Sequence, residues 1–398
     1  MAEPLRAAAE PGLIDGLPRV SARAAPPAAG LADLIAAGVP VVLKGLFAHW
    51  PALAAGQAGQ LPAYLKGLDR GAPVPVMEAP ARTLGKFGYG TDLREFNFTR
   101  RSARLSDALD RILRLAGEDS APHVAVQMLP LAVQMPDFVA QNPMPLLPAD
   151  VAPRLWVGGP VHTRTHNDRD HNLACVLAGR RRFLLFPPDQ LANLYVGPLD
   201  NPPPLSLVDP EAPDLARFPR FADALATARV AFLDPGDALF LPRYWWHHVT
   251  SLSPFNAMVN YWWGDDAMGV EQPHDVFLAA LLAYCRLPPA ERGYWRAMFE
   301  THVFAEDGAA HIPPSQRGPL GEMRASERAA LRQRLREAVR VRWKRFVHIC
   351  MGLLLLTGGF NVDPDRAHDV AMSIRQALAA LVAVERFVSS GHPVRMPL

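Results

Sequence analysis

The stretch Thr163-Arg-Thr-His-Asn-Asp168 places an imidazole, His166, and a carboxylate, Asp168, two residues apart. On an extended strand, side chains two residues apart point to the same face, so both groups can converge on one centre. A distant segment, Trp245-Trp-His-His-Val249, offers two further imidazoles. Two histidines and one carboxylate that leave coordination positions open form the facial triad that holds non-haem Fe(II). The sequence therefore predicts a metal site built from two separate segments.

A His-x-Asp triplet alone is weak evidence, because a lone histidine on an apolar strand is more often a core residue than a ligand. The surrounding strands strengthen the case, since they carry Thr163, Asn172 and Asn260 among apolar neighbours. Buried polar groups cost free energy unless they are hydrogen-bonded, so a bound ligand is a sensible partner for them.

Short apolar segments separated by Gly and Pro run from His123 to Trp263. The expected strands are 123–128, 154–157, 173–177, 181–186, 229–233, 237–241, 247–251 and 257–262. Regular short strands with turn signals favour a sandwich or a double-sheet barrel. Before them we expect a loose arm over residues 1–30, helices at 31–37, 61–68 and 106–115, and strands at 39–44 and 74–78. Within 106–115, Ala108, Leu109, Ile112 and Leu113 have helical spacing. After Gly264 we expect helices at 274–286, 290–305, 325–346 and 364–389.

Composition narrows the class of protein. Of 398 residues, 49% are hydrophobic and 20% are charged, as in a globular protein with a sizeable core. The net charge of +2 gives no reason to expect nucleic acid or an anionic membrane as a partner. The apolar run 347–356 is too short to span a bilayer, and the N-terminus shows no secretory signal. Three scattered cysteines, Cys175, Cys285 and Cys350, favour a reducing compartment, so we expect a cytoplasmic protein.

Several motifs in order resemble the cupin-like JmjC family, which includes the asparaginyl hydroxylase of hypoxia-inducible factor and many bacterial members. The matching runs are 166–173 (HNDRDHNL), 179–188 (GRRRFLLFPP), 235–242 (PGDALFLP) and 245–249 (WWHHV), with 38–45 (GVPVVLKG) and Trp50-Pro51 upstream. This resemblance implies a JmjC/cupin-like catalytic domain over residues 31–264, in which N-terminal α/β elements precede a double-stranded β-helix core. The helices expected after Gly264 would form a C-terminal helical subdomain over 265–398.

Carried over by position, the resemblance implies that His166, Asp168 and His247 bind iron. Because neighbouring residues on a strand face opposite ways, His248 should point elsewhere. The resemblance also implies that 2-oxoglutarate is bound through four side chains: Thr163, Asn172, Arg181 and Asn260.

Two positions depart from the family pattern. The basic residue after the glycine turn is usually Lys in the members similar to the asparaginyl hydroxylase, whereas this chain has Arg181 between Arg180 and Arg182. A guanidinium can hold a carboxylate through two hydrogen bonds, in a wider pocket. A tyrosine that often contacts the co-substrate is absent, because Ala125 or Val126 stands there; Gln127 could contribute instead.

The resemblance implies an oxygenase that uses Fe(II), 2-oxoglutarate and O2 and releases succinate and CO2. Hydroxylation of a protein or peptide side chain or of a small molecule is the expected outcome, and the sequence does not identify the substrate. We expect a homodimer formed by the C-terminal helices, through apolar positions such as Leu331, Leu335, Val339 and Trp343. Two alternatives stay open: a cupin-like protein that binds metal or a carboxylate without turnover, and an oligomeric scaffold carrying a vestigial barrel.

Overall fold

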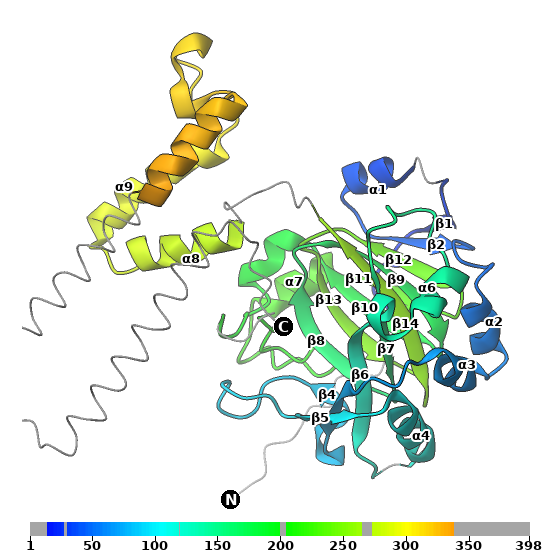
Figure 1. The fold of residues 1–398 in the computed structure, drawn as a ribbon. Helices are drawn as coiled ribbons and strands as arrows, with labels where there is room; N and C mark the ends of the chain where they lie inside the picture. Colours follow the sequence, from blue (N-terminus) through cyan, green and yellow to red (C-terminus); the bar gives the residue numbers. More distant parts are fainter. Residues whose placement is uncertain (1–13, 28–29, 119, 200–203, 265–272, 338–398) are drawn as a thin grey trace, which may run out of the picture. The chain divides into compact units, whose positions relative to one another are not determined.

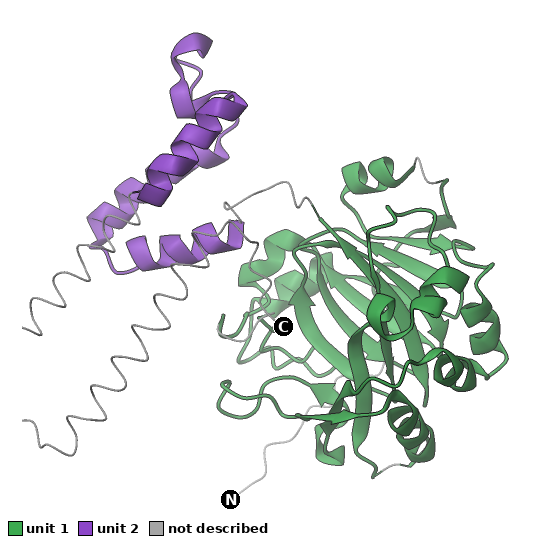
Figure 2. Cartoon of the chain, viewed as in Figure 1, with its two compact units in different colours: residues 1–269 green, residues 270–398 purple. Residues whose placement is uncertain are grey.

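The computed structural model describes residues 14–27, 30–118, 120–199, 204–264 and 273–337 (Figure 1). The chain divides into two compact units, residues 1–269 and residues 270–398 (Figure 2). The predicted division into an arm, a catalytic domain and a dimerisation subdomain stays a prediction, because most of the arm and the last 61 residues, 338–398, lie outside the described residues.

Two β-sheets form the body of the first unit (Figure 1). The larger sheet has the strand order β1-β2-β12-β9-β14-β7-β6-β3-β5, and the smaller one has the order β11-β10-β13-β8-β4. The larger sheet comprises β1 (Ala22–Ala24), β2 (Val41–Lys44), β3 (Val74–Ala79), β5 (Thr99–Ala103), β6 (His123–Pro130), β7 (Pro153–Gly158), β9 (His171–Ala178), β12 (Asp237–Leu241) and β14 (Asn256–Trp263). The smaller sheet comprises β4 (Lys86–Phe87), β8 (His162–Asn167), β10 (Arg181–Phe186), β11 (Arg229–Leu233) and β13 (Trp246–Ser251).

This architecture confirms the predicted double-sheet core. The strands β10, β11 and β12 have the bounds expected from the sequence, and the other predicted strands of the core are slightly longer. Most pairs of neighbouring strands are antiparallel; β1 with β2 and β4 with β8 are parallel. The chain therefore alternates between two facing sheets, which encloses an interior between them.

Alternation along the strands decides which side chains fill this interior. In β10 and β13, Phe183, Leu185 and Val249 are buried in one cluster with Val176 and Met258 of the larger sheet. The residues between them point the other way and pack with the short helix α7 (Phe221–Thr227): Leu184, Phe186 and Trp246. An apolar interior thus lies between the sheets, and any polar side chain that faces it stands out.

Helices cover the outer face of the larger sheet. They are α1 (Leu31–Ala37), α2 (Pro51–Gln57), α3 (Leu61–Leu68), α4 (Leu105–Leu115), α5 (Leu131–Gln134) and α6 (Pro136–Gln141). Helix α4 buries Leu105, Ala108, Leu109 and Ile112, whereas Leu113, which we expected on the same face, is 42% exposed. The buried stripe of α4 therefore contains three of the four expected residues, with Leu105 in place of Leu113.

The second unit is helical in its described part. It contains α8 (Pro273–Tyr284), α9 (Pro289–Phe299) and a further helical segment over 325–337. Within the described residues, α8 buries none of its side chains and exposes Val276, Phe277, Leu278 and Leu282. The expected helix 364–389 and two expected contact residues, Val339 and Trp343, lie outside the described residues, so the homodimer stays a prediction. Among the described helices, none is both long and apolar enough to cross a membrane.

The turn between β9 and β10 sets the start of the strand that carries Arg181. Gly179 has a φ of +71°, and a Cβ there would lie 2.4 Å from the carbonyl oxygen of Phe255. Gly38 has a φ of +60° with no atom within 4 Å of such a Cβ. We expect Gly38→Ala to lower the free energy of unfolding by about 1 kcal/mol, and Gly179→Ala by roughly 2–4 kcal/mol, because a backbone clash adds to the φ strain. Urea denaturation checks this, and equal losses in the two variants would contradict the clash.

Candidate metal centre and co-substrate pocket

Three side chains that bind metals well meet at one end of the interior. His166, Asp168 and His247 each offer one ligand atom, and these atoms lie within 4.8 Å of one another. His166 and His247 are cross-strand partners on β8 and β13, with ring centroids 4.2 Å apart. The Nε2 atom of His247 lies 3.6 Å from Oδ2 of Asp168. The sequence expectation placed Asp168 on the strand with His166, but β8 ends at Asn167, and Asp168 reaches the same centre from the turn that follows.

Backbone carbonyls orient both imidazoles. Nδ1 of His166 lies 2.8 Å from the carbonyl oxygen of Arg164, and Nδ1 of His247 lies 3.1 Å from that of Trp245. When Nδ1–H donates to these oxygens, the Nε2 lone pairs are left for a metal ion. The pKa of His247 is lowered to about 4, first by burial and then by positive charge on His166, while Asp168 and the hydrogen bond to Trp245 act in the opposite direction. His247 is therefore neutral at pH 7, which is the form that binds metal.

Asp168 is held by its neighbours. Its Oδ2 accepts hydrogen bonds from the indole N–H of Trp262 at 3.2 Å and from the amide of Asn172 at 3.4 Å. The amide of Asn260 donates in turn to Oδ1 of Asn172 at 2.8 Å. The backbone N–H of Tyr244 donates to the carbonyl oxygen of Asp168 at 2.8 Å. Asn172 and Asn260 thus form a chain that orients the carboxylate, and their expected contact with 2-oxoglutarate stays a prediction.

A β-bulge brings Thr163 to the metal side of the sheet. His247 pairs with His166 and Val249 pairs with Thr163, so two steps on β13 match three steps on β8. Residues paired across two strands point to the same face of the sheet. The extra residue in β8 therefore lets Thr163 and His166, three residues apart, point to the same face. Thr163 therefore points into the interior with His166, although a spacing of three on a regular strand would separate them.

Arg181 faces the same interior from β10. It pairs with Ser251, four residues along β13 from His247, which corresponds to about 13 Å along the strand. The residue is 5% exposed, and its Nε atom has no hydrogen-bond partner among the described residues. Burial lowers the pKa of Arg181 to about 10, so the guanidinium is still charged at pH 7. A buried cation with an unpartnered donor, at this distance from the metal ligands, fits a small dicarboxylate between them.

The neighbouring arginines point away from this interior. Arg180 is exposed and pairs with Asp234 at 3.3 Å. Arg182 is not a free surface residue, because its side chain is 12% exposed and its guanidinium contacts Glu211 on the outer face of the smaller sheet. Arg181 is thus the member of the arginine run that can serve a ligand inside the barrel.

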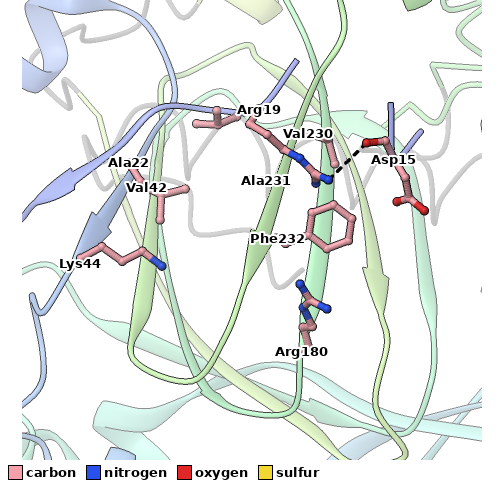
Figure 3. A pocket seen from close by; sticks show the side chains of 10 residues that line it. Asp15, Arg19, Ala22, Val42, Lys44, Arg180, Val230, Ala231 and Phe232 are labelled. Carbon is pink, nitrogen blue, oxygen red and sulfur yellow. Dashed lines mark hydrogen bonds between the residues drawn. The ribbon is translucent and has the colours of Figure 1, made fainter. Parts of the chain in front are cut away.

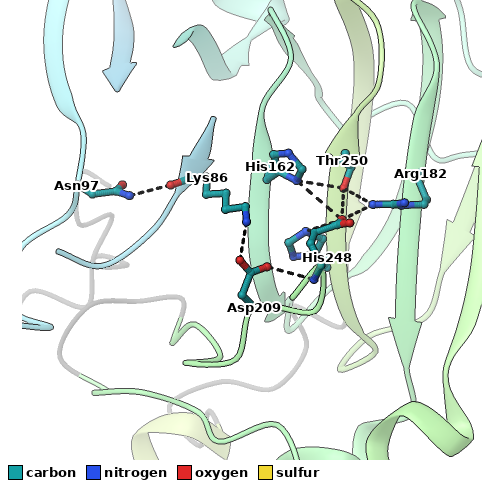
Figure 4. A network of polar contacts seen from close by, with 8 residues as sticks. Lys86, Asn97, His162, Arg182, Asp209, His248 and Thr250 are labelled. Atoms are coloured by element: carbon teal, nitrogen blue, oxygen red, sulfur yellow. Dashed lines mark hydrogen bonds and ion pairs between the residues drawn. The ribbon is translucent and has the colours of Figure 1, made fainter. Parts of the chain in front are cut away.

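A second group of metal-ligating side chains lies on that outer face (Figure 4). His162 and His248 approach Oε1 of Glu211 at 3.9 and 3.7 Å. The guanidinium of Arg182 contacts the same oxygen, and the hydroxyl of Thr250 donates to it at 3.1 Å. The positive charge of Arg182 already neutralises the carboxylate of Glu211, and it would repel a metal cation bound at the same place. We therefore assign the metal centre to His166, Asp168 and His247.

His248 behaves as expected from strand alternation. It points to the outer face, away from its neighbour His247, and it is 2% exposed. Burial, followed by the positive charges of His162 and Arg182, holds the pKa of His248 well below its usual range. No sequence signal linked Glu211 to these residues, because the contact joins a loop to two strands that are distant in the chain.

A cavity of about 530 Å³ lies elsewhere, between the segment before β2 and strand β11 (Figure 3). Its lining includes Arg19, Lys44 and Arg180, and none of the three metal ligands. Lys44 pairs with Asp237 at 2.6 Å, and Arg19 donates to the carbonyl oxygen of Asp15 at 3.2 Å. The basic groups of this cavity are therefore already matched by acceptors, and we do not assign it to the site.

The two candidate clusters make opposite predictions for metal binding. We expect His247→Ala to weaken Fe(II) binding by more than the roughly 10–100-fold typical of losing an outer hydrogen-bond partner, because it removes a ligand. Glu211→Gln, the matched control in the other cluster, should leave the affinity unchanged. Anaerobic calorimetry with Fe(II) measures both. Loss of binding in Glu211→Gln with retention in His247→Ala would reverse our assignment.

Buried neutral histidines also predict a dependence of stability on pH. The pKa values of His162, His247 and His248 are all lowered, chiefly by burial. Between pH 6.5 and 4 the unfolded chain therefore binds more protons than the folded one. The stability that depends on these three neutral histidines is present above pH 6.5 and is lost as the pH falls from 6.5 toward 4. The metal-free protein should have a lower free energy of unfolding at about pH 5 than at about pH 7.5, and His248→Asn should reduce the difference. Equal stability at the two pH values, measured by urea denaturation, would contradict this.

Comparisons with known proteins agree with the fold. Residues 27–268 match the family described as the cupin-like domain. Human HSPB1-associated protein 1 is 39% identical over 112 residues, which are 27% of this chain and 22% of that protein. The zebrafish (Danio rerio) lysine-specific demethylase 8 is 25% identical over 232 residues, 56% of this chain and 53% of that protein. The human bifunctional peptidase and (3S)-lysyl hydroxylase JMJD7 is 27% identical over 265 residues, 58% of this chain and 79% of that protein.

The family match lies within the two-sheet unit. The chain spans only about a quarter of the length of HSPB1-associated protein 1, so that similarity concerns one part of the relative. The family match, in contrast, covers more than half of this chain and contains all seven residues predicted for the site: Thr163, His166, Asp168, Asn172, Arg181, His247 and Asn260. The chain therefore belongs to the family of cupin-like domains, as its JmjC-like motifs had indicated.

Proposed function

We propose that this protein is an Fe(II)- and 2-oxoglutarate-dependent oxygenase. The observation that carries the proposal is the pairing of an open two-histidine, one-carboxylate cluster with a buried arginine on the same interior. His166, Asp168 and His247 offer three ligand atoms within 4.8 Å, and Arg181 offers a buried guanidinium whose Nε atom has no partner among the described residues. Three protein ligands leave positions for a co-substrate and for oxygen.

The protein's own groups prepare this chemistry. Iron, when bound, would couple oxidative decarboxylation of 2-oxoglutarate to oxidation of the substrate. Nε2 of His166, Nε2 of His247 and a carboxylate oxygen of Asp168 would hold it. The indole N–H of Trp262 and the amide of Asn172 keep the carboxylate in place. These hydrogen bonds fix the geometry of the ligands before metal arrives.

Arg181 would orient the co-substrate. Its guanidinium can donate two parallel hydrogen bonds to the far carboxylate of 2-oxoglutarate, while the keto acid end faces the metal ligands. Apolar side chains line the interior around this place, including Phe183, Val249 and Met258. In this poorly solvated space a carboxylate gains more from Arg181 than it would in water.

The expected reaction is hydroxylation of a protein or peptide side chain or of a small molecule. Two of the relatives bear the names lysyl hydroxylase and lysine-specific demethylase, which supports an oxidative activity on a side chain. We also propose that the protein works in the cytoplasm, since Cys175 and Cys285 are unpaired thiols. A fractionation blot that finds the protein outside the cytoplasm would contradict this placement.

Arg181 provides a matched test of co-substrate binding. Adding 2-oxoglutarate to the anaerobic Fe(II) protein should produce a weak visible charge-transfer band. Arg181→Ala should raise the 2-oxoglutarate concentration needed for half of the band by roughly 100-fold, as expected when a charge-assisted bidentate contact worth about 3 kcal/mol is lost. Arg180→Ala, at the exposed neighbour, should leave this concentration unchanged.

The outcomes separate the competing functions. Absence of the band in the intact protein would overturn the oxygenase proposal. A band without release of succinate, over a screen of peptides and metabolites in air, would favour a protein that binds metal and carboxylate without turnover. A band that responds equally to Arg180→Ala and Arg181→Ala would place the carboxylate contact elsewhere.

A further inference from the structure

The interior contains a second unpartnered donor, the indole of Trp156. Trp156 lies on β7, where it pairs with Met258 of β14 and packs against the interior cluster. Its Nε1 atom is buried and has no hydrogen-bond partner among the described residues. A buried N–H group without an acceptor costs about 1–3 kcal/mol, so an acceptor that belongs to the working protein is expected here.

Trp156 lies next to the metal ligands. Its ring meets that of Trp262 edge to face, with the centroids 6.0 Å apart. The indole N–H of Trp262 donates to Oδ2 of Asp168 at 3.2 Å. One aromatic ring therefore separates Trp156 from a ligand side chain, on the apolar cluster that also holds Phe183, two residues from Arg181.

Arg154, two residues before Trp156 on β7, pairs with Asn260 and places its guanidinium over the ring of Trp262 at 5.4 Å, whereas the neighbours of Trp156 toward β6 are small and apolar. Ala125 of β6 is one of the two positions at which the family often has a tyrosine that this chain lacks. It pairs with Gly158 of β7 and is 1% exposed. Gly158 follows Trp156 by two residues on β7, so the three positions share one face of the sheet. Among these three positions of β6 and β7, Trp156 is the one with a side-chain hydrogen-bond donor, its indole N–H.

We infer that the indole N–H of Trp156 donates a hydrogen bond to a carboxylate oxygen of the dicarboxylate co-substrate, alongside the guanidinium of Arg181. The inference rests on the proposed function. An indole can donate but cannot accept a hydrogen bond, so it favours an ionised carboxylate over a neutral alcohol or amine at the same place. It also makes Trp156 a specificity-determining residue of the pocket rather than a packing residue.

Trp156→Phe tests this inference, with Trp263→Phe as its matched control. Phenylalanine keeps an aromatic ring and removes the N–H. Trp263 also has a buried Nε1 without a partner, but it faces the other side of β14 and packs against Phe240 and His171. We expect Trp156→Phe to weaken binding of 2-oxoglutarate to the anaerobic Fe(II) protein by roughly tenfold, which is the loss of about 1.4 kcal/mol. Fe(II) affinity should stay unchanged, and Trp263→Phe should bind 2-oxoglutarate as the wild type does. Calorimetry measures all of these.

A second measurement follows the indole N–H of Trp156 by nuclear magnetic resonance. In zinc-substituted protein labelled with ¹⁵N at its eight tryptophans, 2-oxoglutarate should shift the Trp156 indole N–H resonance downfield and slow its exchange with water. Comparison with Trp156→Phe, or with Trp156→His if the phenylalanine variant does not fold, assigns the resonance. The histidine variant keeps a ring N–H and should retain part of the affinity.

The results distinguish this inference from the proposed function. Wild-type protein that does not bind 2-oxoglutarate overturns both. Wild-type binding with no change in Trp156→Phe, or an equal loss in Trp263→Phe, overturns the role of Trp156 alone. An unmoved Trp156 resonance on addition of 2-oxoglutarate also overturns it, because the indole N–H then has a water molecule as its partner.

Discussion

The pairing of β8 with β13 is the constraint on which the rest of the site depends. It sets His166 opposite His247, and the bulge in β8 then turns Thr163 to the same side. Because side chains alternate along a strand, a slip of β8 by one residue against β13 would turn His166 out of the interior and separate it from His247. The same register directs His248 to the outer face, where it meets Glu211 and Arg182 instead of the metal centre. One strand pair thus separates two histidine clusters of different chemistry.

Most side chains of the interior are apolar, apart from those around the candidate metal centre and the proposed 2-oxoglutarate pocket. Phe183, Val249 and Met258 make a close-packed surface, and burying an unsatisfied polar group among them is unfavourable. Arg181 and Trp156 nevertheless keep unpartnered donors there. A chain selected for stability alone would fill these positions with apolar side chains. Their presence is better explained by an acceptor that the folded protein binds.

Some of the fold could be read from local sequence. The strands β10, β11 and β12 were predicted with their observed bounds, since each is a short apolar run between glycine, proline or charged residues. The candidate metal ligands could be picked out from the sequence, because spacing and family motifs coincide at His166, Asp168 and His247. The contacts that organise them could not be predicted in the same way, and even within the clear helical pattern of α4 the expectation was wrong for one residue, Leu113.

The remaining features depend on contacts between distant segments. A bulge is an irregularity of pairing, so residues 163–168 alone do not reveal that Thr163 joins His166. Asp168 was expected on the strand and lies beyond its end, since the strand pair stops where the turn to β9 begins. Trp156 reads as a packing residue in the sequence. That its indole N–H is buried without a partner follows only from the folded structure, in which β7, β14 and β10 enclose the same interior.

The central claim is that iron binds between β8 and β13 inside the barrel. The most direct test is a crystal of the anaerobic Fe(II) protein with 2-oxoglutarate, with diffraction data collected on both sides of the iron absorption edge. We predict one anomalous peak bounded by Nε2 of His166, Nε2 of His247 and a carboxylate oxygen of Asp168. A peak between His162, Glu211 and His248, or no iron peak in the barrel, would contradict the account.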